Sequence, residues 1–209
     1  MSTFLCFCFC CNYKSRDKFK NSTLVWLTQN CPNLRVLDLS GIIGLTNEGK
    51  NYISKKQTTE NDPGLTSVGT LKNLRQISVH RCSFNSGILL FIPDPNSIRL
   101  DVTFAEALAT LDNLQTLNFC RSGINDDFFS VLVKNNASLP RTLTELDISW
   151  TSVTRNSYPF LLGLTSLRNL KLNGLFSVDQ HWVDELAKNL TRLVNLELRF
   201  NANDNLGNH

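Results

Sequence analysis

One short pattern recurs along the chain and constrains the fold more than any other feature. The pattern is L-x-x-L-x-L, with another apolar residue in some of the leucine slots, and it occurs six times. Because side chains alternate along a strand, the second and third slots place two apolar side chains on one face. A strand of about six residues cannot bury that face alone, so copies must stack beside it. The recurrence therefore predicts a sheet of parallel strands built from the repeats of the chain itself.

The spacing of the copies is typical of a solenoid. The copies begin at Leu34, Leu74, Leu114, Leu143, Leu167 and Leu193, so that successive starts are 40, 40, 29, 24 and 26 residues apart. The last three spacings fall in the range of about 20–29 residues that leucine-rich repeats show. We interpret the two longer spacings as single repeats with surface insertions at residues 57–64 and 91–99. A degenerate copy is also expected over residues 5–33, with Leu5, Cys8 and Cys10 in the three slots.

Helical periodicity appears between the predicted strands. Helices are expected at residues 21–30, 103–111, 126–135 and 178–190, with Asp179 as the N-cap of the last one. Strand, turn and helix alternate along the chain. This alternation predicts an α/β leucine-rich-repeat solenoid, a curved horseshoe with short parallel strands on its concave face and helices and loops on its convex face. Residues 1–209 form one such domain, and we expect a piece of a longer solenoid because neither end shows a capping segment.

Composition excludes several classes of protein. No apolar run approaches the ~18 residues of a membrane span, so no membrane partner is expected. The net charge of +3 is spread without a Lys/Arg block, which argues against nucleic acid as a partner. Neither a metal-ligand spacing nor a phosphate loop occurs, so no metal and no cofactor is expected. Seven cysteines without an even framework indicate reduced thiols in a cytoplasmic or nuclear protein.

The first of the six copies carries a family resemblance. Residues 31–34 (CPNL) and 45–49 (LTNEG) resemble the entry and exit of the cysteine-containing type of leucine-rich repeat, and the chain is also similar to the ribonuclease-inhibitor-like type. Residues 37–41 (LDLSG) and 146–149 (LDIS) are similar to repeats of the Zyg/Zer group, and the whole is similar to the F-box leucine-rich-repeat proteins. The slot that holds Cys or Asn in the family is occupied here by Ile42, Cys82, Ser122, Thr151, Leu175 and Asn201, which predicts a weak internal polar ladder.

The resemblance implies a role as the substrate-reading part of a cullin-RING ubiquitin ligase. Neither an F-box nor an elongin-binding box is found in this sequence. A cullin-RING adaptor would therefore have to bind through a segment that is not seen in this chain.

Residues that alternate with the inward leucines project onto the concave face in three columns, where a protein partner is expected to bind. Trp150 and Arg199 are the preferred contacts, because binding energy at interfaces concentrates on Trp, Tyr and Arg. The alternative for Trp150 is that its ring packs in the turn that follows the strand. The partner-binding candidates are Asp38, Ser40, Gln76, His80, Asn118, Glu145, Asp147, Trp150, Lys171, Asn173, Glu197 and Arg199.

One pair of residues is considered for a catalytic role. His80 and Cys120 share a column in successive copies, and a Cys–His pair is a nucleophile geometry in principle. Their column offers no orienting carboxylate, and an open face offers no oxyanion hole. We therefore expect a non-enzymatic protein–protein interaction module. Two alternatives stay open: a scaffold or truncated paralogue without a ligase adaptor, and a secreted or surface recognition receptor with glycans on Asn21 or Asn136.

Overall fold

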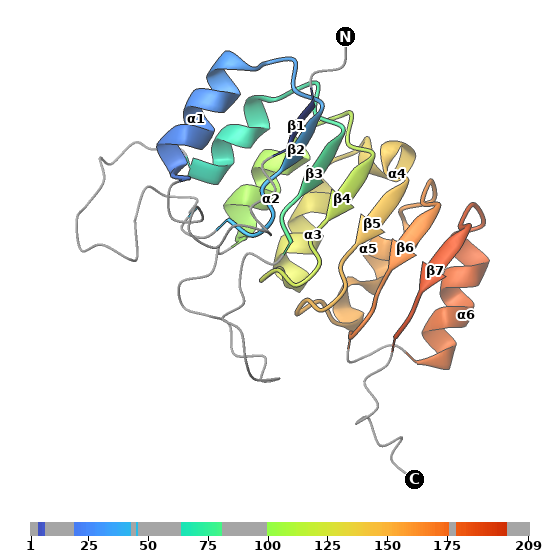
Figure 1. Cartoon of the computed structure of the whole chain (residues 1–209). Helices are drawn as coiled ribbons and strands as arrows, with labels where there is room; N and C mark the ends of the chain where they lie inside the picture. Colours follow the sequence, from blue (N-terminus) through green and yellow to red (C-terminus); the bar gives the residue numbers. More distant parts are fainter. Residues whose placement is uncertain are drawn as a thin grey trace, which may run out of the picture.

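Seven short strands form one parallel sheet in which each strand lies beside its neighbour in sequence (Figure 1). The computed structural model describes residues 4–6, 19–42, 45, 64–80, 100–175 and 179–199. Each of the six L-x-x-L-x-L copies contributes one strand, and its second slot is the central residue of that strand. The strands are β1 (Phe4–Cys6), β2 (Val36–Asp38), β3 (Gln76–Ser78), β4 (Thr116–Asn118), β5 (Glu145–Asp147), β6 (Asn169–Lys171) and β7 (Asn195–Glu197).

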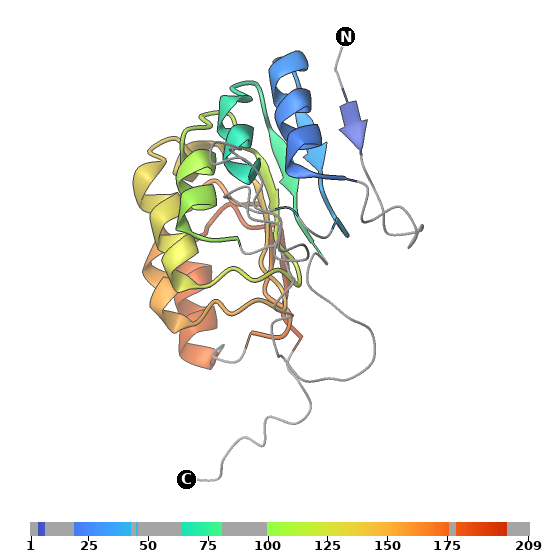
Figure 2. The ribbon, with the colours of Figure 1, turned by 90° about the vertical axis from the view of Figure 1, so that its left-hand side faces the viewer.

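Helical segments connect the strands and lie together on one face of the sheet (Figure 2). The helices at residues 21–30 and 126–135 have the predicted bounds, and the two other predicted helices form with ends that differ by one or two residues. The segments are α1 (Asn21–Asn30), η2 (Gly64–Thr70), α2 (Val102–Ala109), α3 (Asp126–Asn135), α4 (Leu139–Thr142), η3 (Arg155–Ser157), α5 (Tyr158–Leu162) and α6 (Gln180–Asn189). The protein is therefore an α/β structure with a parallel sheet. In the described part of the chain no helix has the length and apolar character that crossing a bilayer demands.

The register of the sheet places equivalent residues of successive copies side by side. Leu37 lies opposite Ile77, for example, and the same alignment continues through β7. The predicted register of β1 is wrong by three residues. Leu5 was expected in the first leucine slot, which Leu34 holds in the next copy, but it pairs with Leu37, which holds the second slot. Apolar residues and cysteines fill almost every position from Phe4 to Cys11, so the pattern fits several registers equally well. Cys8 and Cys10 lie outside the described residues, as do the insertions at 57–63 and 91–99, whereas Gly64 opens η2.

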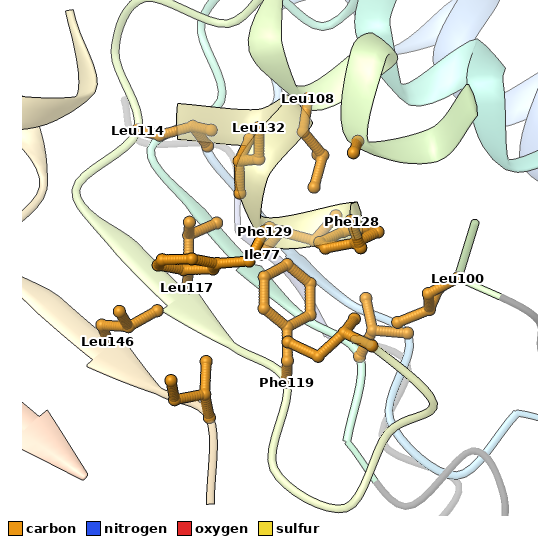
Figure 3. Packing of buried hydrophobic residues seen from close by; sticks show 14 of the residues in the cluster. Ile77, Leu100, Leu108, Leu114, Leu117, Phe119, Phe128, Phe129, Leu132 and Leu146 are labelled. Carbon is orange, nitrogen blue, oxygen red and sulfur yellow. The ribbon is translucent and has the colours of Figure 1, made fainter. Parts of the chain in front are cut away.

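The core lies between the sheet and the helices. The central residues of β2 to β6 are all buried, with exposed fractions of 0–1%. Phenylalanine rings pack against one another in this core. The ring of Phe128 meets that of Phe119 edge-on at 5.4 Å (Figure 3). It also lies 6.1 Å from the ring of Phe104. In β7 the equivalent central residue, Leu196, is 36% exposed. The apolar layer therefore thins at the β7 edge of the sheet.

At its four described slots the internal polar ladder is weak, as the residues there predict. Ile42 and Leu175 bury apolar side chains there. The hydroxyl of Ser122 is buried without a hydrogen-bond partner in the part of the chain that the structure describes. Thr151 Oγ1 donates to the carbonyl of Ile148 within the same copy, at 2.7 Å. The two remaining slots lie outside the described residues.

A different polar ladder joins neighbouring copies, in the turns that precede the strands. The side-chain amide of Asn73 donates to Asn33 Oδ1 at 3.3 Å, and that of Asn113 donates to the carbonyl of Lys72 at 3.0 Å. These asparagines hold the same position in three successive copies. Their hydrogen bonds connect the turns that precede neighbouring strands.

Candidate functional site

The candidate site is the face of the sheet that no described helix covers, which we call the open face. Since the central residue of each strand points toward the helices, the first and third residues project onto the open face. Seven of the twelve candidates hold these positions and come together there. Five of them are half-buried and two are exposed: Asp38, Gln76, Asn118, Asp147 and Lys171 are the half-buried ones, and Glu145 and Glu197 the exposed ones.

Three of these candidates also close the ends of their strands. In each case a side-chain Oδ1 accepts the backbone N–H two residues further on, which is an Asx turn. The bonds join Asp38 to Ser40, Asn118 to Cys120 and Asp147 to Ser149, at 2.9, 3.0 and 3.0 Å. One oxygen of each side chain is therefore committed to the fold before any partner arrives.

Four more candidates lie in the turns, each two positions after the last residue of its strand. They are Ser40, His80, Asn173 and Arg199. Ser40 Oγ lies 2.6 Å from His80 Nδ1, and Asn173 donates its side-chain amide to Glu197 Oε2 at 3.2 Å. Ser40 is fully buried and Asn173 is 8% exposed, whereas Arg199 is exposed. Ser40 and Asn173 therefore tie adjacent copies together, and Arg199 remains open to solvent.

The His80 imidazole faces a buried hydroxyl. Its Nδ1 atom lies against the hydroxyl of Ser40, a residue with 0% exposure, so that hydroxyl is out of reach of a substrate. Cys31 carries a free thiol. Among the described residues no group of three His, Cys, Asp or Glu side chains converges to hold a metal ion.

A hollow of about 540 Å³ opens on the sheet between β5 and β7. Lys171 Nζ lies 2.7 Å from Glu197 Oε1 across it, and both side chains are 45% exposed. The hydrogen bond to Glu197 raises the pKa of Lys171, and the same bond lowers the pKa of Glu197. Both groups are thus charged at neutral pH. The hollow is lined by Glu145, Asn169, Leu170, Lys171, Val194, Asn195, Leu196 and Glu197.

Two further side-chain bonds organise the floor of this hollow. Asn169 donates to Glu145 Oε1 at 3.2 Å, and Asn195 donates to Asn169 Oδ1 at 2.7 Å. These bonds run across β5, β6 and β7 and fix the rotamers of the side chains that form them. Asn169 and Asn195 were not among the candidates, although both occupy the first position of their strands.

Trp150 packs in the turn after β5. Its backbone has a φ of 58°, and its ring lies directly on Gly174 of the next copy. The Arg121 guanidinium, from the preceding copy, lies over the ring at 5.9 Å from its centroid. The indole is half-buried between two copies, as the packing alternative predicts. Gly41 holds the equivalent position and also has a positive φ, 74°.

Asp126 organises a network that sequence reasoning missed. Its carboxylate, in the first turn of α3, accepts from Thr154 N at 2.8 Å, Thr154 Oγ1 at 2.6 Å and Ser157 Oγ at 2.6 Å. The Asn156 amide adds a bond of 3.5 Å. Burial alone would raise the pKa of Asp126, but these hydrogen bonds together outweigh it and lower the pKa. The network joins α3 to η3 and is structural.

The glycans that a secreted receptor would carry do not fit the two expected positions. Asn21 is 8% exposed and Asn136 is 1% exposed. The Asn136 amide donates to the carbonyl of Leu111 at 3.0 Å, and its Oδ1 accepts from the N–H groups of Ser138 and Leu139. An N-linked sugar on this folded position would break those bonds.

No protein-family model and no curated protein matches the chain. Two of the solved structures that are similar to it illustrate the likeness. One is titled "Leiomodin-1 Actin-Binding Site 2 (ABS2)", with 20% identity and a TM-score of 0.38; the match covers 47% of this chain, which spans 61% of that one. The other is the tropomodulin C-terminal domain of Caenorhabditis elegans, with 10% identity and a TM-score of 0.49, covering 82% of this chain and 92% of that one.

These findings correct the resemblance to ubiquitin-ligase substrate receptors. The two structures named above are a leiomodin and a tropomodulin domain, and neither is an F-box or Zyg/Zer receptor. The phrases that carried the resemblance, residues 37–41 and 146–149, contain the Asp-x-Ser turns that close β2 and β5. Those residues have a local structural cause, so the phrases are no sign of a ligase.

Proposed function

We propose that the chain is a leucine-rich-repeat solenoid whose open face binds another protein without catalysing a reaction. The sequential strand order, the constant register and one helical segment or more in each fully described connection support the solenoid. The observation that carries the binding role is the hollow over β5 to β7. It is accessible, polar and held in shape by bonds between neighbouring strands.

The chemistry of the hollow suits a protein surface. Glu145, Lys171 and Glu197 offer both signs of charge, and Asn169 and Asn195 offer amide donors and acceptors. Because cross-strand bonds already order these side chains, a partner meets a largely preorganised surface and less side-chain entropy is lost on binding. Of the candidates, the buried Asn173 supports this surface through its bond to Glu197, and the exposed members are the ones that contact the partner.

Affinity purification with mass spectrometry tests the role if matched variants are compared. The open-face variant is Glu145→Arg with Asn195→Arg, and both positions are exposed. The control variant is Asp184→Arg with Gln180→Arg, which makes the same charge change at two exposed positions of α6 on the helical face. Thermal melts of the three purified proteins verify that both variants fold.

The expected result is a set of proteins that is recovered with the wild type and with the control and is lost with the open-face variant. Loss of the same proteins from both variants would mean that charge alone drives capture. Recovery of identical proteins with all three would contradict binding at the hollow.

A further inference from the structure

A row of exposed arginines precedes the strands, beside the open face. Arg35, Arg75 and Arg168 are the residues directly before β2, β3 and β6, and all three are exposed. Backbone bonds align the row from strand to strand: Arg75 N donates to Arg35 O at 2.8 Å, and Gln115 and Thr144 continue the series to Arg168. We call Arg35, Arg75 and Arg168 the arginine row.

The charge of this row is not neutralised within the described part of the chain, where no carboxylate lies within ion-pair distance of any of the three guanidinium groups. Two carboxylates of the neighbouring copies bond to other groups: Asp112 accepts from Ser138 and Glu145 accepts from Asn169. Arg35 and Arg75 directly precede adjacent strands, whose backbones are about 4.8 Å apart. Like charges placed opposite each other are destabilising, and an anion between them removes that cost.

We propose that the arginine row binds an acidic, extended segment of a partner protein. This goes beyond the proposed function, since it names a second surface and the chemistry of what binds there. From Arg75 to Arg168 the row crosses three strand spacings, about 14 Å, which about four residues of extended peptide would span. The matching segment carries two acidic residues close together and a third about four residues further on. Gln115 and Thr144 lie between, where polar side chains of the segment pass.

The surroundings favour an acidic peptide over a continuous polyanion. Nucleic-acid sites combine basic side chains with aromatic ones on which bases stack, whereas the residues of this row and those between them are not aromatic. The open face beside the row has a negative balance that repels a long polyanion but tolerates a short segment. Its charged candidates are Asp38, Glu145, Asp147 and Glu197, against Lys171 and Arg199.

Fluorescence polarisation with the 209-residue protein tests the proposal. The probe is a labelled, otherwise Ser/Gly-rich peptide with three glutamates at the spacing above, and its comparison peptide has glutamine at those positions. Arg35→Glu with Arg75→Glu is the test variant. Arg155→Glu with Lys188→Glu makes the same charge change at two exposed positions outside the row. Circular dichroism checks that each variant folds, and Arg35→Gln with Arg75→Gln replaces the test variant if it does not.

We expect the glutamate peptide to bind the wild type more tightly than the glutamine peptide. The test variant should bind it about tenfold more weakly and the control within about twofold, since two favourable charge contacts become repulsive. Affinity should fall as salt rises. A peptide with lysine at the three positions should bind the test variant better than it binds the wild type.

Three results would overturn the proposal. The first is equal binding of the glutamate and glutamine peptides, and the second is equal loss of binding in the test and control variants. The third is tighter binding of an oligouridine RNA or of phosphatidylserine vesicles, with the same dependence on Arg35 and Arg75. The test and control variants change no residue that lines the hollow over β5 to β7, so failure here is distinguishable from failure of the proposed function.

Discussion

Gly174 is the position where one added methyl group tests the packing between copies most directly. It follows β6 and has a φ of +69°. A Cβ built on it would lie 2.1, 2.4 and 2.5 Å from three carbon atoms of the Trp150 ring. These distances fall far inside the ~3.5 Å at which carbon atoms attract each other. Gly174→Ala therefore forces either the ring or the backbone to move.

The cost follows from two separate sources. An alanine in the left-handed region costs roughly 1 kcal/mol relative to glycine. Displacing a packed aromatic ring adds about 1–3 kcal/mol, as other overpacking substitutions do. We expect Gly174→Ala to lower the free energy of unfolding by about 2–4 kcal/mol, which is a large share of the roughly 5–15 kcal/mol that holds a domain folded.

Urea denaturation followed by far-UV circular dichroism measures this loss, and two further variants locate its source. Gly163→Ala is the matched control, because its φ is −71° and the nearest atom to its added Cβ is 3.3 Å away. We expect this control to change stability by less than about 1 kcal/mol. In a Trp150→Ala background the ring is gone, so Gly174→Ala should cost only the backbone part, about 1 kcal/mol.

The double-mutant cycle decides between the two sources. A coupling of about 1–3 kcal/mol between Gly174→Ala and Trp150→Ala is the result we expect for residues in contact. An equal cost of Gly174→Ala in both backgrounds would refute the ring contact. A neutral Gly174→Ala would refute the whole argument.

Three other predictions concern two single side chains and one ion pair. Asp126→Ala should lower the free energy of unfolding by about 2 kcal/mol at neutral pH in urea denaturation. Because the folded pKa of Asp126 lies below its ordinary 3.8, this stabilisation is complete above pH 3.8 and is lost as the pH falls through the folded pKa. A cost that did not shrink in acid would contradict this account. Asn136→Ala should cost about 2–3 kcal/mol by the same measurement, because it leaves the buried Leu111 carbonyl without its side-chain donor; a loss below about 0.5 kcal/mol would contradict this. The Lys171–Glu197 pair, with both side chains 45% exposed, should contribute under about 1 kcal/mol in a double-mutant cycle and lose most of it in high salt; a large, salt-independent coupling would speak against this account.

Local periodicity predicted the strands and most of the helices correctly. Leu37, Leu117 and Leu170 lie at the centres of β2, β4 and β6 because apolar residues with strand spacing must face one side. α1 and α3 have the predicted bounds for a similar reason, since helical spacing is visible within ten residues. The prediction failed at β1, where the positions from Phe4 to Cys11 are apolar or cysteine. Several registers fit such a run equally well, and the predicted position of Leu5 was wrong by three residues.

The residues of the Asx turns were noticed in the sequence, but only the structure explained them. Asp38-x-Ser40 and Asp147-x-Ser149 were visible as repeated phrases, and they were interpreted as marks of a family. Their hydrogen bonds show a physical cause that acts over two residues. The Asp-x-Ser spacing alone would have predicted a turn at the ends of β2 and β5.

The sequence by itself determined what each copy does within its own length: where the strand lies, which side chains are inward and which face outward. Only the tertiary structure decided what one copy does to the next. Trp150 rests on Gly174, Asp126 accepts from Thr154 and Ser157, and Arg35 stands beside Arg75, over separations of 24 to 40 residues. Such contacts depend on the strand register and on the turn lengths together, and no local pattern in the chain records either of them.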